Sequence, residues 1–244
     1  MKPRVSRRAL VTGGSGGIGA AICRRLAAAG HHVYVHAHRN GPAADAVVSE
    51  IVTAGGSAQS LCFDVTDAAA ATRALEGVLE AGAVQILVNN AGIHADAVLA
   101  GMSEQQWRSV IDVSLHGFFH VTQPLLLPMI RTRWGRIITC SSVSALVGNR
   151  GQVNYSAAKG ALNSATKSLA QEVANRGVTV NAVAPGIIDT PMSAPAFDAA
   201  RIAQLVPMQR AGTADEVAAL VQFLSSQEAG YITGQIIAVS GGIA

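Results

Sequence analysis

The stretch Ala9-Leu-Val-Thr-Gly-Gly-Ser-Gly-Gly-Ile-Gly19 decides the fold of this 244-residue chain. It joins a short apolar run to a glycine-rich turn, and the helix-favouring run Ala20-Ala-Ile-Cys-Arg-Arg-Leu26 follows directly. In a strand–turn–helix unit, glycines let the backbone approach a pyrophosphate closely, and the free N–H groups at the helix start bind it. The stretch therefore predicts a dinucleotide-binding α/β domain whose cofactor contacts include Gly13, Ser15, Gly17, Ile18 and Gly19.

The rest of the chain repeats this pattern, because apolar runs alternate with amphipathic stretches about every thirty residues, as in βαβ units. The predicted strands are 9–12, 33–36, 58–63, 86–89, 136–140, 178–182 and 236–239. The predicted helices lie near 18–29, 42–54, 67–81, 104–130, 154–175 and 213–226. We expect one domain over residues 1–244: a Rossmann-type, doubly wound parallel sheet of about seven strands flanked by helices.

Composition narrows the class of protein. Half of the residues are hydrophobic and only 14% are charged, so much surface should be hidden in a core or between subunits. The net charge of +3 comes from scattered arginines and lysines, which argues against a nucleic-acid partner. No run approaches the roughly 18 apolar residues of a membrane span. Cys23, Cys62 and Cys140 lie far apart, which favours reduced thiols and a cytoplasmic protein.

The end of the second predicted strand reads Val35-His-Ala-His-Arg-Asn40. A site that prefers NADH would place an acid here for the ribose 2′-OH, whereas Arg39 can pair with a 2′-phosphate, so NADPH is favoured. The alternative is a solvated Arg39, because Gly16 supplies no second basic group in the glycine turn. His36 and His38 alternate along the strand end, but no nearby carboxylate or cysteine completes a metal shell, and we expect no metal.

Tyr155 and Lys159 stand four residues apart in Asn154-Tyr-Ser-Ala-Ala-Lys159. On a helix this spacing puts both side chains on one face. The chain has only three tyrosines and three lysines, so chance explains the pair poorly. An ammonium group one turn away favours the phenolate and lowers the pKa of a tyrosine. The pair predicts a proton donor with Tyr155 as the acid.

Together these features resemble the short-chain dehydrogenase/reductase family, from about residue 8 to the last residue. The resemblance also rests on Asn89-Asn-Ala-Gly92, on Ser142 thirteen residues before Tyr155, on Pro185-Gly-Ile-Ile-Asp-Thr190 and on the closing stretch 232–242. Among members, Gly148-Asn-Arg-Gly-Gln-Val-Asn-Tyr-Ser-Ala-Ala-Lys159 with Asn181-Ala-Val-Ala-Pro-Gly186 is most similar to β-ketoacyl-(acyl-carrier-protein) reductases, and within these to variants of aryl-polyene pigment synthesis.

The resemblance implies a role for each of these residues. Tyr155 would protonate a ketone oxygen as hydride leaves the nicotinamide, Ser142 would hydrogen-bond that oxygen, and Lys159 would bind the nicotinamide ribose. The further implied cofactor contacts are Asp64 and Val65 at adenine, Asn89, Ala91 and Gly92 at the adenosine ribose, and Pro185, Gly186, Ile188 and Thr190 on the nicotinamide side. The implied reaction is the reduction by NADPH of 3-oxoacyl thioesters on acyl carrier protein, in fatty-acid or polyene synthesis. Turnover of free ketones or alcohols stays open, because a fold does not fix a substrate.

One position departs from the family's pattern. Members carry Asn in the helix predicted at 104–130, where it holds a water that joins the lysine to solvent, and this chain has Ser114. If a backbone carbonyl holds that water, Ser114 keeps the relay with some loss of rate. If the Asn side chain is required, the chain is a cofactor-binding partner of a related subunit with little activity of its own.

Arg133 and Arg176 fall at positions that dock acyl carrier protein in reductases of this kind. Two exposed arginines flanking the cleft would steer an acidic carrier, whereas the alternative is two ordinary arginines at helix C-termini. The family implies a homotetramer or homodimer, and Ser114 adds a heteromer with a related subunit. The segment 192–208 mixes Pro, Met and Phe, which predicts a mobile apolar lid.

Overall fold

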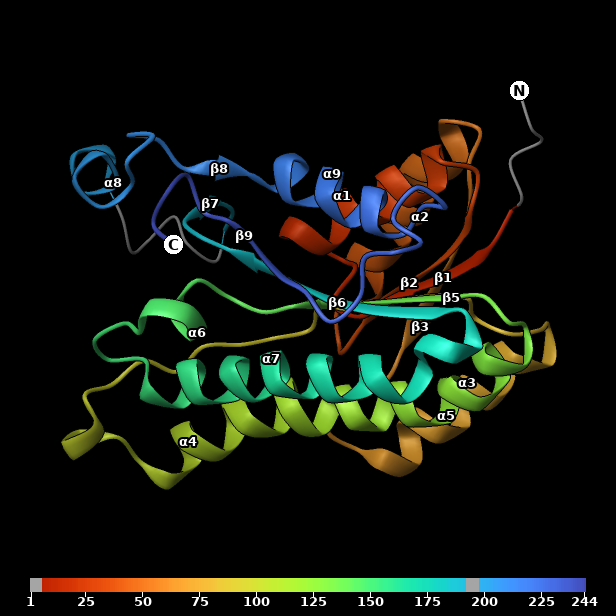
Figure 1. Ribbon diagram of the computed structural model, residues 1–244, viewed down its shortest axis with the longest axis horizontal. Helices are drawn as coiled ribbons and strands as arrows, with labels where there is room; N and C mark the ends of the chain where they lie inside the picture. Colours follow the sequence, from red (N-terminus) through yellow and green to blue (C-terminus); the bar gives the residue numbers. More distant parts are fainter. Residues whose placement is uncertain (1–5, 192–197) are drawn as a thin grey trace.

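The fold is known from a computed structural model that describes residues 6–191 and 198–244. Its centre is a seven-stranded, fully parallel sheet in the order β3-β2-β1-β4-β5-β6-β9 (Figure 1). The strands are β1 Arg8–Val11, β2 His32–Ala37, β3 Ser57–Cys62, β4 Ile86–Asn89, β5 Gly135–Cys140, β6 Val178–Pro185 and β9 Ile236–Val239. All seven predicted strands and the predicted α/β fold are confirmed.

Helices cover both faces of the sheet. One face carries α1 Gly17–Ala28, α2 Gly41–Thr53 and α9 Ala214–Leu224, and the other carries α3 Ala68–Glu80, α5 Gly117–Arg131 and α7 Val153–Val173 (Figure 1). Each layer has its own apolar core, with Ile22 and Leu224 fully buried in the first and Leu75 and Leu125 in the second. The near-continuous apolar strands follow from this arrangement, because a parallel sheet between two helix layers is buried on both faces.

Side-chain caps fix where several helices begin. Asn40 accepts a hydrogen bond from the third residue of α2, and Asp67 does the same for α3. Thr213 and Glu216 form a reciprocal capping box at the start of α9. These caps satisfy N–H groups that have no partner within the helix, and they set the length of the loops that follow the strands.

The predicted continuous helix 104–130 is wrong in one respect, because a π-helical turn, η2 Asp112–His116, separates α4 Glu104–Ile111 from α5. The turn ends where the N–H of Gly117 donates to the carbonyl of Asp112. A Cβ atom at Gly117 would lie 2.9 Å from the side chain of Val65, so the helix packs tightly against the loop after β3 at this point. Such π-turns occur frequently at functional sites. This one carries Ser114 into the interior.

The short elements were not predicted. They are η1 Leu99–Gly101, α6 Ser144–Val147, η3 Ala174–Arg176, β7 Ile188–Asp189, α8 Ala199–Leu205 and β8 Gly212–Thr213, of which β7 and β8 pair in a separate small sheet. Elements of two to seven residues are too short to show a hydrophobic period. Among the residues that the structure describes, no helix has the length and apolarity that crossing a bilayer requires.

Candidate active site

The predicted cofactor residues lie at one edge of the sheet. Each of the segments that carry them follows the carboxyl end of a strand: β1, β2, β3, β4 and β6. The chain winds outward from β1 through β2 to β3, and then from β4 to β6 in the other direction. Nucleotides bind at such a switch point in open α/β sheets.

The glycine turn has the shape of a phosphate cradle. Gly13 and Gly17 adopt φ values of +62° and +51°, which side chains rarely allow. A Cβ atom at Gly19 would lie 2.1 Å from the carbonyl oxygen of Gly13, so the start of α1 touches the turn. Nδ2 of Asn90 closes the turn from the other side, since it donates to the carbonyls of Thr12 (2.9 Å) and Gly13 (3.0 Å). The residues present therefore fit a dinucleotide pyrophosphate.

His36 supports this turn from beneath, a role that the sequence did not reveal. The side chain is 1% exposed. Its Nδ1 accepts a hydrogen bond from the N–H of Gly13 (3.1 Å), and its Nε2 donates to the carbonyl of Phe63 (2.9 Å). Burial lowers the pKa of His36 to about 4, which keeps the ring neutral at physiological pH. The ring thus joins the glycine turn to the end of β3.

Arg39 lies exposed just beyond β2, as an arginine that meets a 2′-phosphate would. The neighbouring His38 places Nε2 3.1 Å from a carboxylate oxygen of Asp64. Burial raises the pKa of Asp64, but hydrogen bonds from Thr66 and the nearby His38 and Arg39 outweigh it and lower the pKa. His36 and His38 therefore have different partners, and among the described residues no cluster suits a metal ion.

Ser142 and Tyr155 meet beside Lys159, as the sequence predicts. Ser142 follows β5, while Tyr155 and Lys159 lie in the first two turns of α7. Lys159 is 3% exposed, and its Nζ lies 5.7 Å from the centre of the Tyr155 ring. A Cβ atom at Gly92 would lie 3.2 Å from the same Nζ, so the loop after β4 reaches the lysine too.

The expected lowering of the Tyr155 pKa is wrong for this structure. Burial raises the pKa of Tyr155, and the hydrogen bond to Ser142 offsets this only in part. Two features explain the difference: the ammonium group of Lys159 faces the tyrosine ring and the carbonyl of Cys140, and burial lowers its own pKa to about 8. A tyrosine with a raised pKa stays protonated, which suits a proton donor.

Ser114 lies within the π-turn at 3% exposure, and its Oγ atom has no hydrogen-bond partner among the described residues. The turn packs against α7, the helix that carries Lys159. A buried hydroxyl without a protein partner is usually satisfied by water. This position can therefore hold a water, as the predicted relay requires.

Arg133 and Arg176 do not flank the cleft of their own chain. Arg133 precedes β5 and Arg176 precedes β6, so both lie at the amino edge of the sheet, opposite the catalytic residues. They are neighbours there, because a Cβ atom at Gly177 would lie 2.3 Å from the carbonyl oxygen of Arg133. The 21-residue helix α7 separates Arg176 from Tyr155 by about 30 Å, at 1.5 Å per residue.

Of the predicted lid, residues 192–197 lie outside the described residues. Its second half contains α8, which begins at an Asp198 cap and ends at the exposed Leu205; Met208, three residues beyond, is also exposed. Val206 is buried, and Met208 donates through its N–H to the carbonyl of Gly241, so this part of the segment is joined to the end of the chain.

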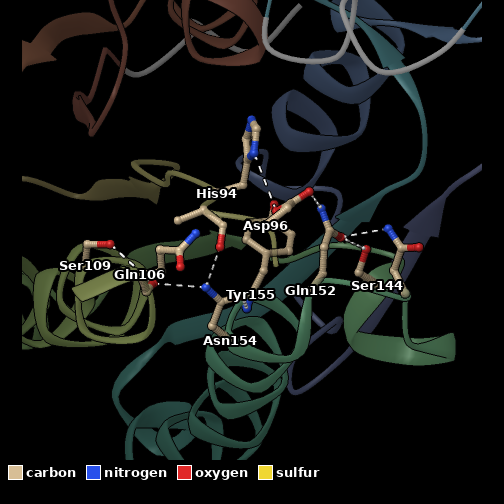
Figure 2. A network of polar contacts seen from close by, with 10 residues as sticks. His94, Asp96, Gln106, Ser109, Ser144, Gln152, Asn154 and Tyr155 are labelled. Atoms are coloured by element: carbon tan, nitrogen blue, oxygen red, sulfur yellow. Dashed lines mark hydrogen bonds and ion pairs between the residues drawn. The ribbon is translucent and has the colours of Figure 1, made fainter. Parts of the chain in front are cut away.

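A network of polar side chains lines the site on the side of α6 and the start of α7 (Figure 2). It includes Asp96, Ser144, Gln152 and Asn154, none of which the sequence singled out. Individually these residue types are common in loops, and only the fold brings them together. As a whole, the site offers a protonated phenol, a second hydroxyl in contact with it and a buried ammonium group. This set can protonate and stabilise an oxygen that gains negative charge.

Comparison with known proteins identifies the family of the chain. Residues 7–201 match the family model described as short chain dehydrogenase. The chain is 46% identical over 239 residues to the 3-oxoacyl-(acyl-carrier-protein) reductase of Escherichia coli K12, with 96% of each chain covered. It is 43% identical to the reductase of the same name from Aggregatibacter actinomycetemcomitans (98% of this chain, 100% of the relative) and 42% identical to that from Staphylococcus aureus Mu50 (98% and 99%).

Proposed function

Because this chain belongs to the short-chain dehydrogenase/reductase family, we propose that it reduces 3-oxoacyl thioesters on an acyl carrier protein to 3-hydroxyacyl thioesters in fatty-acid synthesis. The observation that carries the proposal is similarity of 42–46% over nearly the whole chain to relatives with this activity in their names. The contact between Ser142 and Tyr155 beside Lys159 supports it, because this chain retains the groups that ketone reduction needs.

In this mechanism Tyr155 and Ser142 bind the ketone oxygen. A bound nicotinamide supplies the hydride. As the oxygen becomes an alkoxide, Ser142 donates a hydrogen bond to it and Tyr155 transfers its phenolic proton to it. The Nζ atom of Lys159 lies 5.7 Å from the centre of the Tyr155 ring, and at this distance its positive charge stabilises the phenolate that remains. A proton relayed from solvent past Ser114 restores Tyr155.

We infer that the cofactor is NADPH, held along the carboxyl edge of the sheet by the glycine turn, Asp64 to Val65, Asn89 to Gly92, and Pro185 to Thr190. Arg39 is exposed at the end of β2, where no acid stands in sequence. Asp64 lies 3.1 Å from Nε2 of His38, and among the described residues Arg39 forms no salt bridge. Arg39 thus remains available for the 2′-phosphate.

If two copies of the chain pair, Arg133 and Arg176 can dock a carrier protein at the other copy's cleft. The exposed face of α5 carries Phe119 and Leu127, which are 60% and 56% exposed and suit burial against a second copy. A two-fold axis perpendicular to α5 and α7 would place the C-terminal ends of one copy's helices beside the N-terminal ends of its partner's. Each arginine pair would then flank the other copy's cleft. We propose such a pairing within a homodimer or homotetramer, in the cytoplasm.

The experiment that tests the function follows NADPH oxidation with one 3-oxoacyl chain presented on carrier protein, on coenzyme A and as a free ketone. The proposal predicts the highest kcat/KM on the carrier. It also predicts that Arg133→Glu with Arg176→Glu reduces carrier turnover at least tenfold and coenzyme A turnover less than twofold. Preference for the free ketone would contradict the proposal. Preference for conjugated over saturated acyl chains would assign the chain to polyene synthesis instead of fatty-acid synthesis.

A further inference from the structure

Gln152 stands at the centre of the polar network beside Tyr155 (Figure 2). Its amide oxygen accepts hydrogen bonds from the Ser144 hydroxyl (3.1 Å) and from Nδ2 of Asn149 (2.9 Å). Its amide nitrogen donates to the carboxylate of Asp96 (2.9 Å). One side chain thus joins α6, the segment before α7 and the loop after β4.

The network continues to the catalytic serine. The backbone N–H of Ser144 donates to the hydroxyl oxygen of Ser142 (3.1 Å), and both serines are 8% exposed. Since this bond occupies one lone pair of that oxygen, the hydroxyl proton of Ser142 points away from Ser144. Tyr155 lies on the remaining side, in contact with Ser142. The position of Ser144 therefore determines where Ser142 directs its proton.

The Asp96 end of the network is equally well held. Asn154 is fully buried, and its Nδ2 donates to the carbonyls of Ala95 and Gln106 (3.0 Å each). The N–H of Ala97 donates to the carbonyl of Gly151 (2.9 Å). His94 lies 3.5 Å from the second oxygen of Asp96. The backbone on both sides of Asp96 is thus held, while its side chain is 45% exposed, and Asp96 is close enough to Tyr155 to raise its pKa.

We propose that Asp96, Gln152 and Ser144 form a positioning chain that holds the Ser142 hydroxyl toward the ketone oxygen. The inference rests on the proposed function, because it assigns to Ser142 the oxygen-binding role in that reaction. None of the three residues touches the reacting atoms in this account. Their effect on the rate passes through Ser142.

A double-mutant cycle separates this role from simple support of the loops. Gln152→Met removes both hydrogen-bonding ends of the side chain at similar length. We expect it to lower kcat for thioester reduction about tenfold, the scale of one lost hydrogen bond in a transition state, with the melting temperature and the Kd for NADPH little changed. In a Ser142→Ala background the same substitution should change kcat less than twofold. An equal loss in both backgrounds would overturn the proposal.

Three further variants keep the test decisive if Gln152→Met folds poorly. Asp96→Asn keeps an acceptor for Gln152 and should retain most of kcat, whereas Asp96→Leu should match the loss expected for Gln152→Met. Asn149→Ala removes a bond to the same amide oxygen but leaves the path from Asp96 to Ser142 intact, so it should leave kcat unchanged. Equal effects of Asp96→Asn and Asp96→Leu, or a tenfold loss in Asn149→Ala, would contradict the proposal.

A readout without turnover comes from the absorbance of the Tyr155 phenolate in a pH titration, measured as the difference from Tyr155→Phe. Because the Ser142 hydrogen bond lowers the pKa of Tyr155, loss of the positioning chain should raise that pKa. An unchanged titration in Gln152→Met would contradict the proposal. If the wild type reduces free ketones and no thioesters, the proposed function is wrong. The same double-mutant cycle, measured with that ketone, still tests the positioning chain. A protein that turns over no ketone contradicts both.

Discussion

The Nζ atom of Lys159 donates a 2.7 Å hydrogen bond to the backbone carbonyl of Cys140, the last residue of β5. Ser142 follows two residues later, so one bond joins the helix that carries the proton donor to the strand that delivers the oxygen-binding serine. The bond also holds the ammonium group in the interior, where burial lowers its pKa to about 8.

This relationship predicts how the reaction depends on pH. Reduction requires a protonated Tyr155, whose raised pKa keeps it protonated, and a charged Lys159, which loses its proton as the pH rises through about 8. We therefore expect kcat/KM for reduction to fall above about pH 8. Lys159→Arg, whose guanidinium stays charged, should shift that fall to higher pH, though with a lower maximum. An identical midpoint in both proteins would show that another group titrates.

The glycine turn predicts a selective loss of cofactor binding. Gly19→Ala would place a methyl group 2.1 Å from the carbonyl oxygen of Gly13, so the turn must shift. We expect the Kd for NADPH, measured by fluorescence titration, to rise at least about tenfold, or 1.4 kcal/mol. Gly77→Ala is the matched control, since its Cβ meets nothing within 4 Å on α3. It should leave binding unchanged and stabilise the fold by up to about 1 kcal/mol; equal binding by both variants would contradict the cradle.

Protonation of the buried His36 is expected to lower the stability of the fold in mild acid. The pKa of His36 is lowered from the usual 6.5 of a histidine to about 4 in the fold, so the unfolded chain binds the proton more readily between these values. The contribution of His36 to the free energy of unfolding is complete above the pKa of the unfolded chain. It decreases as the pH falls from about 6.5 to about 4, by roughly 3 kcal/mol in total. His36→Asn keeps an acceptor for Gly13 but does not titrate. The difference between the two proteins in the free energy of unfolding, measured by urea denaturation, should change by that amount between pH 7 and pH 4; a constant difference would contradict the prediction.

Substitution of Ser114 is expected to increase the kcat of reduction. Its hydroxyl has no partner among the described residues, which suits a bound water. Ser114→Asn offers that water both a donor and an acceptor, and we expect kcat to rise about two- to fivefold at unchanged Kd for NADPH. Ser114→Ala, the control, should lower kcat by a similar factor. If Ser114→Asn has no effect and Ser114→Ala retains full activity, the relay does not depend on this side chain.

Local patterns were enough to predict the sheet and the catalytic residues. Three features can each be recognised from a few neighbouring residues: the apolar strands, the turn at 12–19, and the spacing of Tyr155 and Lys159. The structure brings the turn and this pair together at one edge of the sheet. The π-turn at Asp112–His116 could not be predicted, because one wider turn leaves the hydrophobic pattern of a helix almost unchanged. His36 and Gln152 acquire their roles from partners distant in sequence, such as Phe63 and Asp96.

Two sequence-based expectations failed for physical reasons. The pKa of Tyr155 depends on burial, which composition does not reveal, and here burial outweighs the hydrogen bond with Ser142. Arg133 and Arg176 were expected beside the cleft, yet residues that precede parallel strands lie at the amino edge, far from residues that follow them. The placement of Arg133 and Arg176 could have been predicted from the order of the strands alone. Carrier docking by these arginines therefore requires that two copies of the chain pair.

The proposed reaction depends above all on Tyr155 as the group that protonates a 3-oxoacyl thioester on a carrier protein. The most direct measurement follows NADPH absorbance with 3-oxoacyl carrier protein for the wild type and for Tyr155→Phe, together with the Kd for NADPH of each. We expect turnover by the wild type, a loss of at least about a thousandfold in kcat for the variant, in the range of general acid catalysis, and NADPH affinities within threefold of each other. Binding of NADPH without any turnover by the wild type, or full turnover by Tyr155→Phe, would contradict it.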